Sequence, residues 1–427
     1  MIDIYTVSVL VFFAVLGILI WRDRKNIEIK SKIIIMRRTK RFRTIIDDIS
    51  KPSTTAFRIL SLSLSAFILF AGILFLLNKN ILGYIIIFLS IIAFSMALGR
   101  PWWFWKSIST AGVVLALFFM IYGFYMLTAS ANMIFQGIIK QPGVHIVLPS
   151  LGATSVTGPG YILIPFWFWF IVIAAILVPH ELSHGIMARA EKIRLKSVGL
   201  LLLAIFPGAF VEPDENALKK SRLIKKLRIF AAGSLANFLV AFFVFTVTAY
   251  LIWPNTLENN NILIINVTEG SPAALAGISQ NTIITEINGK PVTPTYAEFI
   301  SGKGYFQDEL PGAKPGDTVV FKSYDKEYNV TLSEKNGKAY MGIYYTPIYK
   351  QNSILAALLP LLTMIWLFSF GVGLFNILPL YPLDGGMIVS ALAERFASKN
   401  AGAIVKTLSS ITLFIILYNI FGPLIIA

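Results

Sequence analysis

The sequence predicts a multi-pass α-helical membrane protein of about eight transmembrane helices, with a small, mainly β, soluble domain inserted between them. Three observations support this fold class. The 427 residues are 56% hydrophobic and only 14% charged. Several uninterrupted apolar segments are long enough to span a bilayer. Residues 254–350, in contrast, are polar and are interrupted by Gly, Pro and Asn.

Eight apolar segments account for the predicted transmembrane helices. A helix needs about 20 predominantly apolar residues to cross the hydrocarbon core. The segments are residues 4–21, 57–77, 81–99, 107–127, 161–183, 229–253, 354–380 and 401–425. A basic stretch follows the first segment, and no small-residue cleavage site lies near its end. We therefore expect a retained transmembrane helix and not a removed signal peptide.

Basic residues predict the orientation of the chain. Residues 22–58 contain twelve Lys and Arg against four Asp and Glu, and residues 189–228 contain ten Lys and Arg. If both stretches are cytoplasmic, the N-terminus lies outside and 27 of the 37 basic residues lie inside. The net charge of +15 is then explained by anionic lipid head groups, and we expect no nucleic-acid partner.

Four parts follow along the chain. Residues 1–128 form an N-terminal four-helix transmembrane region with a basic cytoplasmic loop at 22–58. Residues 129–253 form the first part of a membrane core. Residues 254–350 are the inserted domain, and residues 351–427 complete the core and add the last transmembrane helix.

Two segments differ from the helical pattern. Residues 199–211 are apolar but too short to span, and Pro207-Gly208 would interrupt a helix, so we expect a re-entrant or membrane-surface element. The insert alternates apolar and polar residues in several short runs, which is typical of strands. Its ten acidic and eight basic residues suit the outer side of the membrane.

The stretch HELSHG, residues 180–185, carries a metal-binding pattern. Residues four apart lie on one face of a helix, so His180 and His184 can hold one zinc ion beside Glu181. Zinc with an open position activates water, and Glu181 can take the proton and pass it to a leaving amine. The alternative is a structural pair of histidines, but ionisable residues are costly at membrane depth.

A third metal ligand must come from elsewhere, and the chain has no cysteine. His145 lies in a predicted outer loop. Asp384 lies in FNILPLYPLDGGM, at the inner end of its apolar segment and at the predicted membrane level of His180 and His184. Prolines and glycines around Asp384 would interrupt the helix there. Non-helical backbone at membrane depth is tolerated where it lines a water-filled cavity. The alternative for Asp384 is a helix-end carboxylate that faces a Lys or Arg.

Asn376 precedes Asp384 by eight residues. Its amide can donate a hydrogen bond to a substrate carbonyl or a developing oxyanion. An ordinary hydrogen bond between helices is the alternative.

These motifs together resemble the site-2 protease family of intramembrane zinc metalloproteases. HELSHG matches that family's HExxHG, and NILPLYPLDGG (376–386) matches its NxxPxxPxDG. The resemblance covers roughly residues 140–390. It implies a three-span catalytic core with one zinc ion held by His180, His184 and Asp384, and Glu181 as general acid and base. In the family a Gly-Pro motif with a later Asn precedes the insert; here Gly233-Ser234 and Asn237 stand in that place, which makes Asn237 a candidate for substrate contact.

The insert resembles a PDZ domain of the kind found in proteases. The stretches GSPAALAGI (270–278), IITEINGKPV (283–292) and KPGDTVVF (314–321) follow the order of that domain. PDZ domains can bind an extended peptide as an added strand. The alternative is a steric filter that admits only small outer segments.

These features predict an endopeptidase of the cell membrane that hydrolyses peptide bonds of transmembrane proteins, as in regulated intramembrane proteolysis. We expect the catalytic motifs near the cytoplasmic side and the PDZ-like domain outside. A metal transporter and a catalytically silent relative that binds membrane proteins are the alternatives. A prenyl-type membrane protease would need a later glutamate ligand, and the sequence offers only Glu394.

Overall fold

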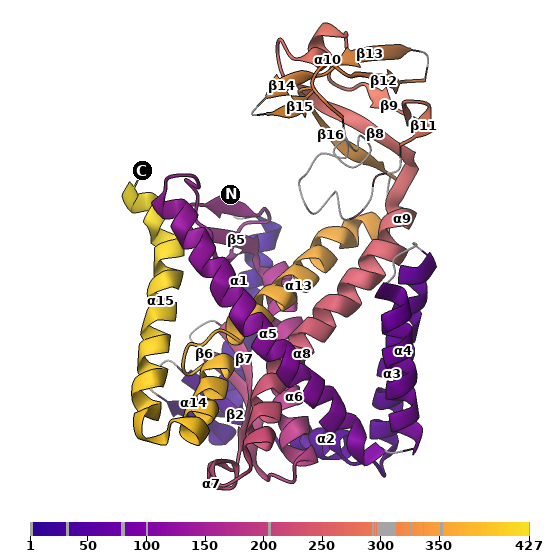
Figure 1. The fold of residues 1–427 in the computed structure, drawn as a ribbon. Coiled ribbons are helices and arrows are strands. Elements are labelled where there is room, and N and C mark those ends of the chain that lie inside the picture. The colour runs from indigo at the N-terminus through magenta and orange to yellow at the C-terminus, as the bar shows by residue number, and fades with distance from the viewer. Residues whose placement is uncertain are drawn as a thin grey trace. The chain divides into compact units, whose positions relative to one another are not determined.

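The protein is described by a computed structural model that divides into two compact units. The structure describes all residues except 1–2, 31–33, 78–81, 100, 204–205, 293, 295, 297–312, 325, 336, 351–352 and 427. The membrane unit comprises residues 1–243 and 364–427, and the insert unit comprises residues 244–363. Figure 1 shows the course of the chain.

Eight helices among the described residues are long and apolar enough to cross a membrane, which confirms the multi-pass prediction. They are α1 (Ile4–Arg22), α3 (Thr55–Leu77), α4 (Leu82–Gly99), α5 (Pro101–Phe135), α6 (Phe166–Ala190), α8 (Leu223–Val247), α13 (Ile354–Asn376) and α15 (Ala401–Ile426). The 19 residues of α1 rise about 28 Å, close to the thickness of the hydrocarbon core. Helix α8 continues through a π-helical turn, Thr248–Ile252, into α9 (Trp253–Thr256).

The start of the predicted segment 161–183 is a strand and not a helix. Strand β5 (Tyr161–Pro165) pairs in parallel with β3 (Ile146–Ser150) and antiparallel with β4 (Val156–Gly158). Helix α6 begins at Phe166 and runs to Ala190, seven residues beyond the predicted end. The motif at 180–185 therefore lies inside a helix and not at its end.

A four-stranded antiparallel sheet joins the N-terminal region to the core. Strands β1 (Ile27–Lys30) and β2 (Ile34–Arg38) come from the segment predicted only as a basic loop. Strand β2 pairs with β6 (Leu195–Leu203), and β6 pairs with β7 (Phe206–Pro213), which gives the order β1-β2-β6-β7. The segment 199–211, predicted as re-entrant or surface-bound, belongs to this β6-β7 hairpin.

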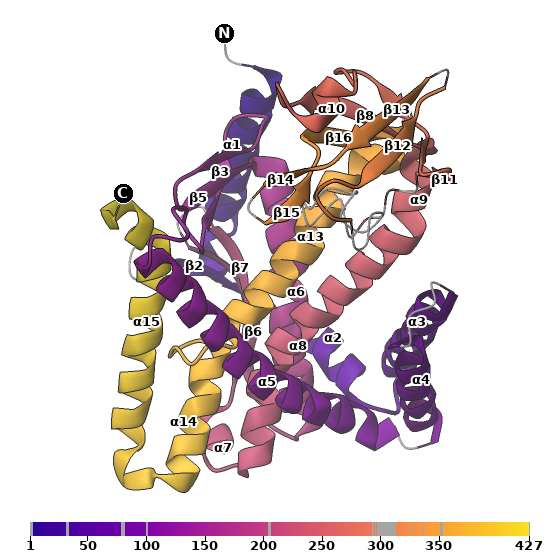
Figure 2. The ribbon, with the colours of Figure 1, turned by 45° about the horizontal axis from the view of Figure 1, so that its top comes forward.

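The main core of the membrane unit lies where α5, α6 and α8 meet the short helix α14 (Asp384–Phe396). Buried side chains from all four helices pack together there, with β6 contributing two more: Val113, Ala116, Met120, Met187, Ala188, Leu195, Val198, Ile229, Phe230, Ile388 and Ala391. Helix α2 (Lys40–Ser50) packs on α6, and Arg189 forms an ion pair with Asp47. Figure 2 shows α14 beside α15. This core fixes the helices that carry the candidate site.

The insert unit is a small β domain, as predicted. Its strands are β8 (Leu257–Val267), β9 (Ile283–Ile284), β10 (Glu286–Ile287), β11 (Lys290–Pro291), β12 (Thr318–Lys322), β13 (Glu327–Thr331), β14 (Ser333–Lys335), β15 (Lys338–Tyr340) and β16 (Ile343–Tyr349), with the short helix α10 (Pro272–Leu275). They form sheets of order β16-β8-β9 and β11-β10-β12-β13 and the pair β14-β15. Its own buried core includes Ile262, Phe321 and Val330. The PDZ resemblance remains a prediction.

Candidate metal centre

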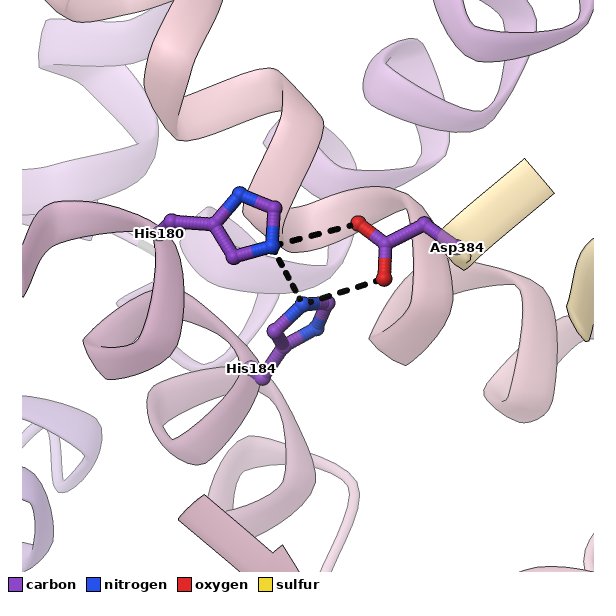
Figure 3. Close-up of side chains that lie close together, drawn as sticks. All are labelled: His180, His184 and Asp384. Carbon is purple, nitrogen blue, oxygen red and sulfur yellow. Dashed lines mark hydrogen bonds and ion pairs between the residues drawn. The ribbon is translucent and has the colours of Figure 1, made fainter. Parts of the chain in front are cut away.

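Helix α6 presents His180 and His184 one turn apart on a single face. Their Nε2 atoms lie 3.3 Å from one another. Figure 3 shows both rings directed toward the carboxylate of Asp384. The i, i+4 spacing of a helix therefore brings the two nitrogens together, as the sequence predicted.

Asp384 is the first residue of α14. A tight turn between α13 and α14 brings it close to the two histidines. The residues that connect α13 to α14 pack against the first helical turn of α14. A Cβ at Gly386, in that helical turn, would lie 2.5 Å from the main-chain carbonyl carbon of Leu380 in the connection. Any side chain would collide there, so the glycine is required for this close approach. Asp384 is buried and faces the histidines and Ser234, not a Lys or Arg.

Three potential ligand groups form a compact triangle. The carboxylate oxygens of Asp384 lie 3.5 Å from His180 Nε2 and 3.3 Å from His184 Nε2. Ligands about 2.0–2.1 Å from a tetrahedral zinc ion would stand roughly 3.3 Å apart. Two imidazoles and a carboxylate are also a ligand set that zinc accepts, with a position left open. The three residues thus fit a zinc ion, and they are the only such group of three among the residues described.

Outer hydrogen bonds fix both rings. His184 Nδ1 lies 2.7 Å from the carbonyl oxygen of Ile229 on α8, so it donates a proton there and leaves the Nε2 lone pair free for a metal. The side-chain amide of Asn237 lies 3.1 Å from His180 Nδ1. The side chain of Asn237, the candidate for substrate contact, is fully buried against His180, and its contact with substrate stays a prediction.

Gly233 leaves the space in which a metal would lie. A Cβ at this position would approach His180 Nε2 to 2.6 Å and would also collide with His184 Nε2. The helix α8 can therefore pass the site only with glycine at this point. Its neighbour Ser234, for which the sequence predicted no contact, donates a hydrogen bond of 3.3 Å to Asp384 Oδ2.

Glu181 lies beside this triangle and is held by strand β7. Its Oε2 accepts a hydrogen bond of 3.3 Å from the backbone N–H of Val211. The sequence did not predict this contact, because it depends on a β hairpin that packs along α6. One strand thus contacts the residue proposed as general base.

The remaining candidates do not join the triangle. Asn376 is the last residue of α13 and is half-buried; in the described structure it makes no hydrogen bond to His180, His184 or Asp384. His145 precedes β3 in a loop, as predicted. Glu394 forms an ion pair of 3.2 Å with Lys226 and is more than half exposed, so it is no metal ligand here.

A membrane-embedded helical core with a buried His-His-Asp group defines a class of metal-dependent membrane enzymes, and sequence comparison identifies the family. The model of peptidase family M50 matches residues 168–419, more than half of the chain. The chain belongs to this family, which is the site-2 protease family. The matched residues include both HELSHG (180–185) and NILPLYPLDGG (376–386).

Two relatives extend this comparison. An uncharacterized protein from Methanocaldococcus jannaschii is 31% identical over 332 residues, which cover 73% of this chain and 81% of the relative. A membrane-bound transcription factor site-2 protease homolog from Arabidopsis thaliana is 26% identical over 190 residues, which cover 43% of this chain and 34% of the relative.

Proposed function

We propose that the protein is an intramembrane zinc endopeptidase that hydrolyses peptide bonds of membrane-spanning proteins. The observation that carries the proposal is the compact triangle of His180, His184 and Asp384 with Glu181 beside it, all within a helical membrane unit. Membership of peptidase family M50 supports the same reaction class. Regulated intramembrane proteolysis is the process that fits such an activity.

Each residue of the site has a role in this proposal. His180, His184 and Asp384 hold the zinc ion, which, when bound, supplies a Lewis acid for water and for the scissile carbonyl. Glu181 takes the proton of the attacking water and delivers it to the leaving amine. The N–H of Val211 keeps the Glu181 carboxylate in place for both transfers.

A substrate must be unwound to be cut, because a helix hides its carbonyl groups in its own hydrogen bonds. Strand β7 is the last strand in the order β1-β2-β6-β7, and within the described residues its outer edge pairs with no strand. An extended peptide can add to such an edge through main-chain hydrogen bonds. The location of β7 beside Glu181 therefore supports extended binding at the site.

The test uses purified protein in lipid vesicles with a single-span test substrate. We expect wild-type protein to contain about one zinc ion per chain and to cleave the substrate. Glu181→Gln should retain zinc but lose cleavage, because proton transfer typically contributes about 10²- to 10⁴-fold. A chelator should abolish cleavage, and added zinc should restore it. Cleavage that persists in Glu181→Gln would contradict the proposal and leave a non-hydrolytic function.

A further inference from the structure

Two acceptor motifs for N-linked sugars occur in the chain, and both lie in the insert. The acceptor motif is Asn-x-Ser/Thr, in which x is not proline. Of the 19 asparagines in the chain, only Asn266 and Asn329 stand in this motif, as NVT at residues 266–268 and 329–331. The sequence of the membrane unit contains no such motif. The proposed proteolysis gives these two asparagines no role.

Asn329 lies on strand β13 with its side chain directed away from the core of the insert. Residues alternate along this strand: Tyr328 and Val330 are buried in the core, whereas Asn329 and Thr331 are exposed. Residues two apart share a face of a strand, so the amide and the threonine hydroxyl of the motif lie on the same solvent side. The buried Val330 between them holds the motif in this orientation.

Asn266 faces outward because of a β-bulge in strand β8. Ile264 is buried, so regular alternation would direct Asn266 into the core as well. Two successive residues of β16 lie opposite Ile264 and Asn266, which leaves Ile265 as an extra residue. Such an extra residue redirects the side chains that follow it. Val267 therefore packs against the core of the insert, and Asn266 is exposed.

The side-chain amides of both asparagines are free of structural hydrogen bonds. Asn261, also on β8, is 8% exposed and donates to the hydroxyl of Tyr324. Asn288 accepts a hydrogen bond from a backbone N–H of β12. In the part of the chain that the structure describes, Asn266 and Asn329 make no side-chain hydrogen bond of this kind. Modification of their amides therefore removes no contact that holds the insert together.

We propose that Asn266 and Asn329 are N-glycosylated. The donor is an oligosaccharide whose anomeric carbon is linked to a lipid phosphate on the outer side of the membrane. The bond between this carbon and the phosphate oxygen breaks, a bond from the carbon to the asparagine Nδ2 forms, and the amide loses one proton. The lipid phosphate leaves with the electron pair of the broken bond. The proposal rests on the predicted outer location of the insert and not on its proteolytic activity.

A sugar on Asn329 would also shield the edge of a sheet. Strand β13 is the last strand in the order β11-β10-β12-β13, and among the described residues it pairs only with β12. An unpaired edge can join a strand of another chain, and bulky or charged groups prevent this. Asn329 is the middle residue of the strand (Figure 1). A hydrated oligosaccharide there would keep the insert soluble and block such pairing.

The first test is the mass of two peptides of the protein, isolated from the membranes of the cells that naturally produce it. Trypsin releases residues 327–335, EYNVTLSEK, which contain Asn329, and a glutamate-specific protease releases residues 259–269, which contain Asn266. We expect the mass of each peptide to exceed that of the unmodified peptide by a whole number of sugar residues. Unmodified mass of both peptides would overturn the proposal, and unmodified mass of one would overturn the assignment of that asparagine.

The second test uses variants expressed in the same cells. Asn329→Gln and Thr331→Ala should lose the added mass on residues 327–335, because each destroys the motif. Thr331→Ser preserves the motif and should keep the added mass, and all three variants should remain modified at Asn266. Added mass that persists in Asn329→Gln would show that the sugar is attached elsewhere in the peptide, and the proposal would be wrong.

Labelling of a single cysteine separates this proposal from the predicted orientation. Glu334→Cys lies on the exposed strand β14 of the insert. If a membrane-impermeant maleimide labels it on intact cells while both peptides are unmodified, the glycosylation proposal alone is wrong. If Glu334→Cys is labelled only after the membrane is opened, the insert lies inside, and the glycosylation proposal fails together with the orientation. The proposed proteolysis stands in both cases.

Discussion

The contact of Asn237 with His180 bears on how this histidine would present its ring to a metal ion. For Nε2 to offer a lone pair, Nδ1 must carry the proton and donate it. The amide of Asn237 lies 3.1 Å away through Nδ2, while its buried Oδ1 has no hydrogen-bond partner in the described structure. A 180° flip of the Asn237 side-chain amide exchanges the positions of Nδ2 and Oδ1. Oδ1 then accepts a hydrogen bond from the Nδ1–H group of His180. We therefore regard Asn237 as a positioning residue in the zinc-bound form.

This role predicts that Asn237→Ala weakens zinc binding. Loss of such an outer hydrogen bond typically costs about 10- to 100-fold in metal affinity or activity. Asn237→Asp, which keeps an acceptor, should recover most of the affinity. The measurement is competition for zinc against a chelator of known strength, with cleavage followed in parallel. If Asn237 contacts substrate instead, Asn237→Ala will bind zinc normally and only turnover will fall.

An ion-pair network around the buried Glu191 joins the ends of α6 and α8. The carboxylate of Glu191, just after α6, is 3% exposed and lies 2.6 Å from Arg228 and 3.6 Å from Lys225. Residue 229 follows Arg228 directly, and its carbonyl accepts the His184 proton. The network therefore ties α6 to α8 next to the carbonyl group that accepts the hydrogen bond from His184.

Glu191→Ala should destabilise the protein by about 1–3 kcal/mol, because it leaves the partly buried Arg228 without its carboxylate partner. Glu215→Ala, on the exposed helix α7 (Glu215–Lys219), should change stability by less than about 0.5 kcal/mol. Thermal or denaturant unfolding in detergent, with chelator present to remove the contribution of zinc, measures both. Equal stability of the two variants would show that the network does not hold the helices.

Local patterns predicted the helices and the residues of the His-His-Asp group, whereas the features that were not predicted depend on pairing between distant segments. The i, i+4 spacing of His180 and His184 depends on one helix alone, and the apolar length of each span is also local. The pairing of β2 with β6 joins residues more than 150 positions apart, and no periodicity in either segment indicates it. The contact of Glu181 with Val211 and the place of Asn237 against His180 depend on such packing and were not predicted.

The distribution of charge over the whole chain still predicts its orientation. Basic residues near the ends of transmembrane helices stay in the cytoplasm, and residues 189–228 hold ten of them in the stretch that leads from α6 to α8. The insert follows one further crossing, by α8, and carries more acidic than basic residues. We therefore predict that the residues around α7 face the cytoplasm and that the insert lies outside.

Single cysteines test this orientation. Glu334→Cys, on the exposed strand β14 of the insert, should react with a membrane-impermeant maleimide on intact cells. Glu215→Cys on α7 should react only after the membrane is opened, because α8 separates the two positions. The cysteine-free chain is the blank for both measurements. The predicted pattern places His180 and His184 near the cytoplasm, because they lie in the last three turns of α6 before the basic segment. Cleavage products would then be released on the cytoplasmic side. The reverse pattern would place both histidines near the outer side.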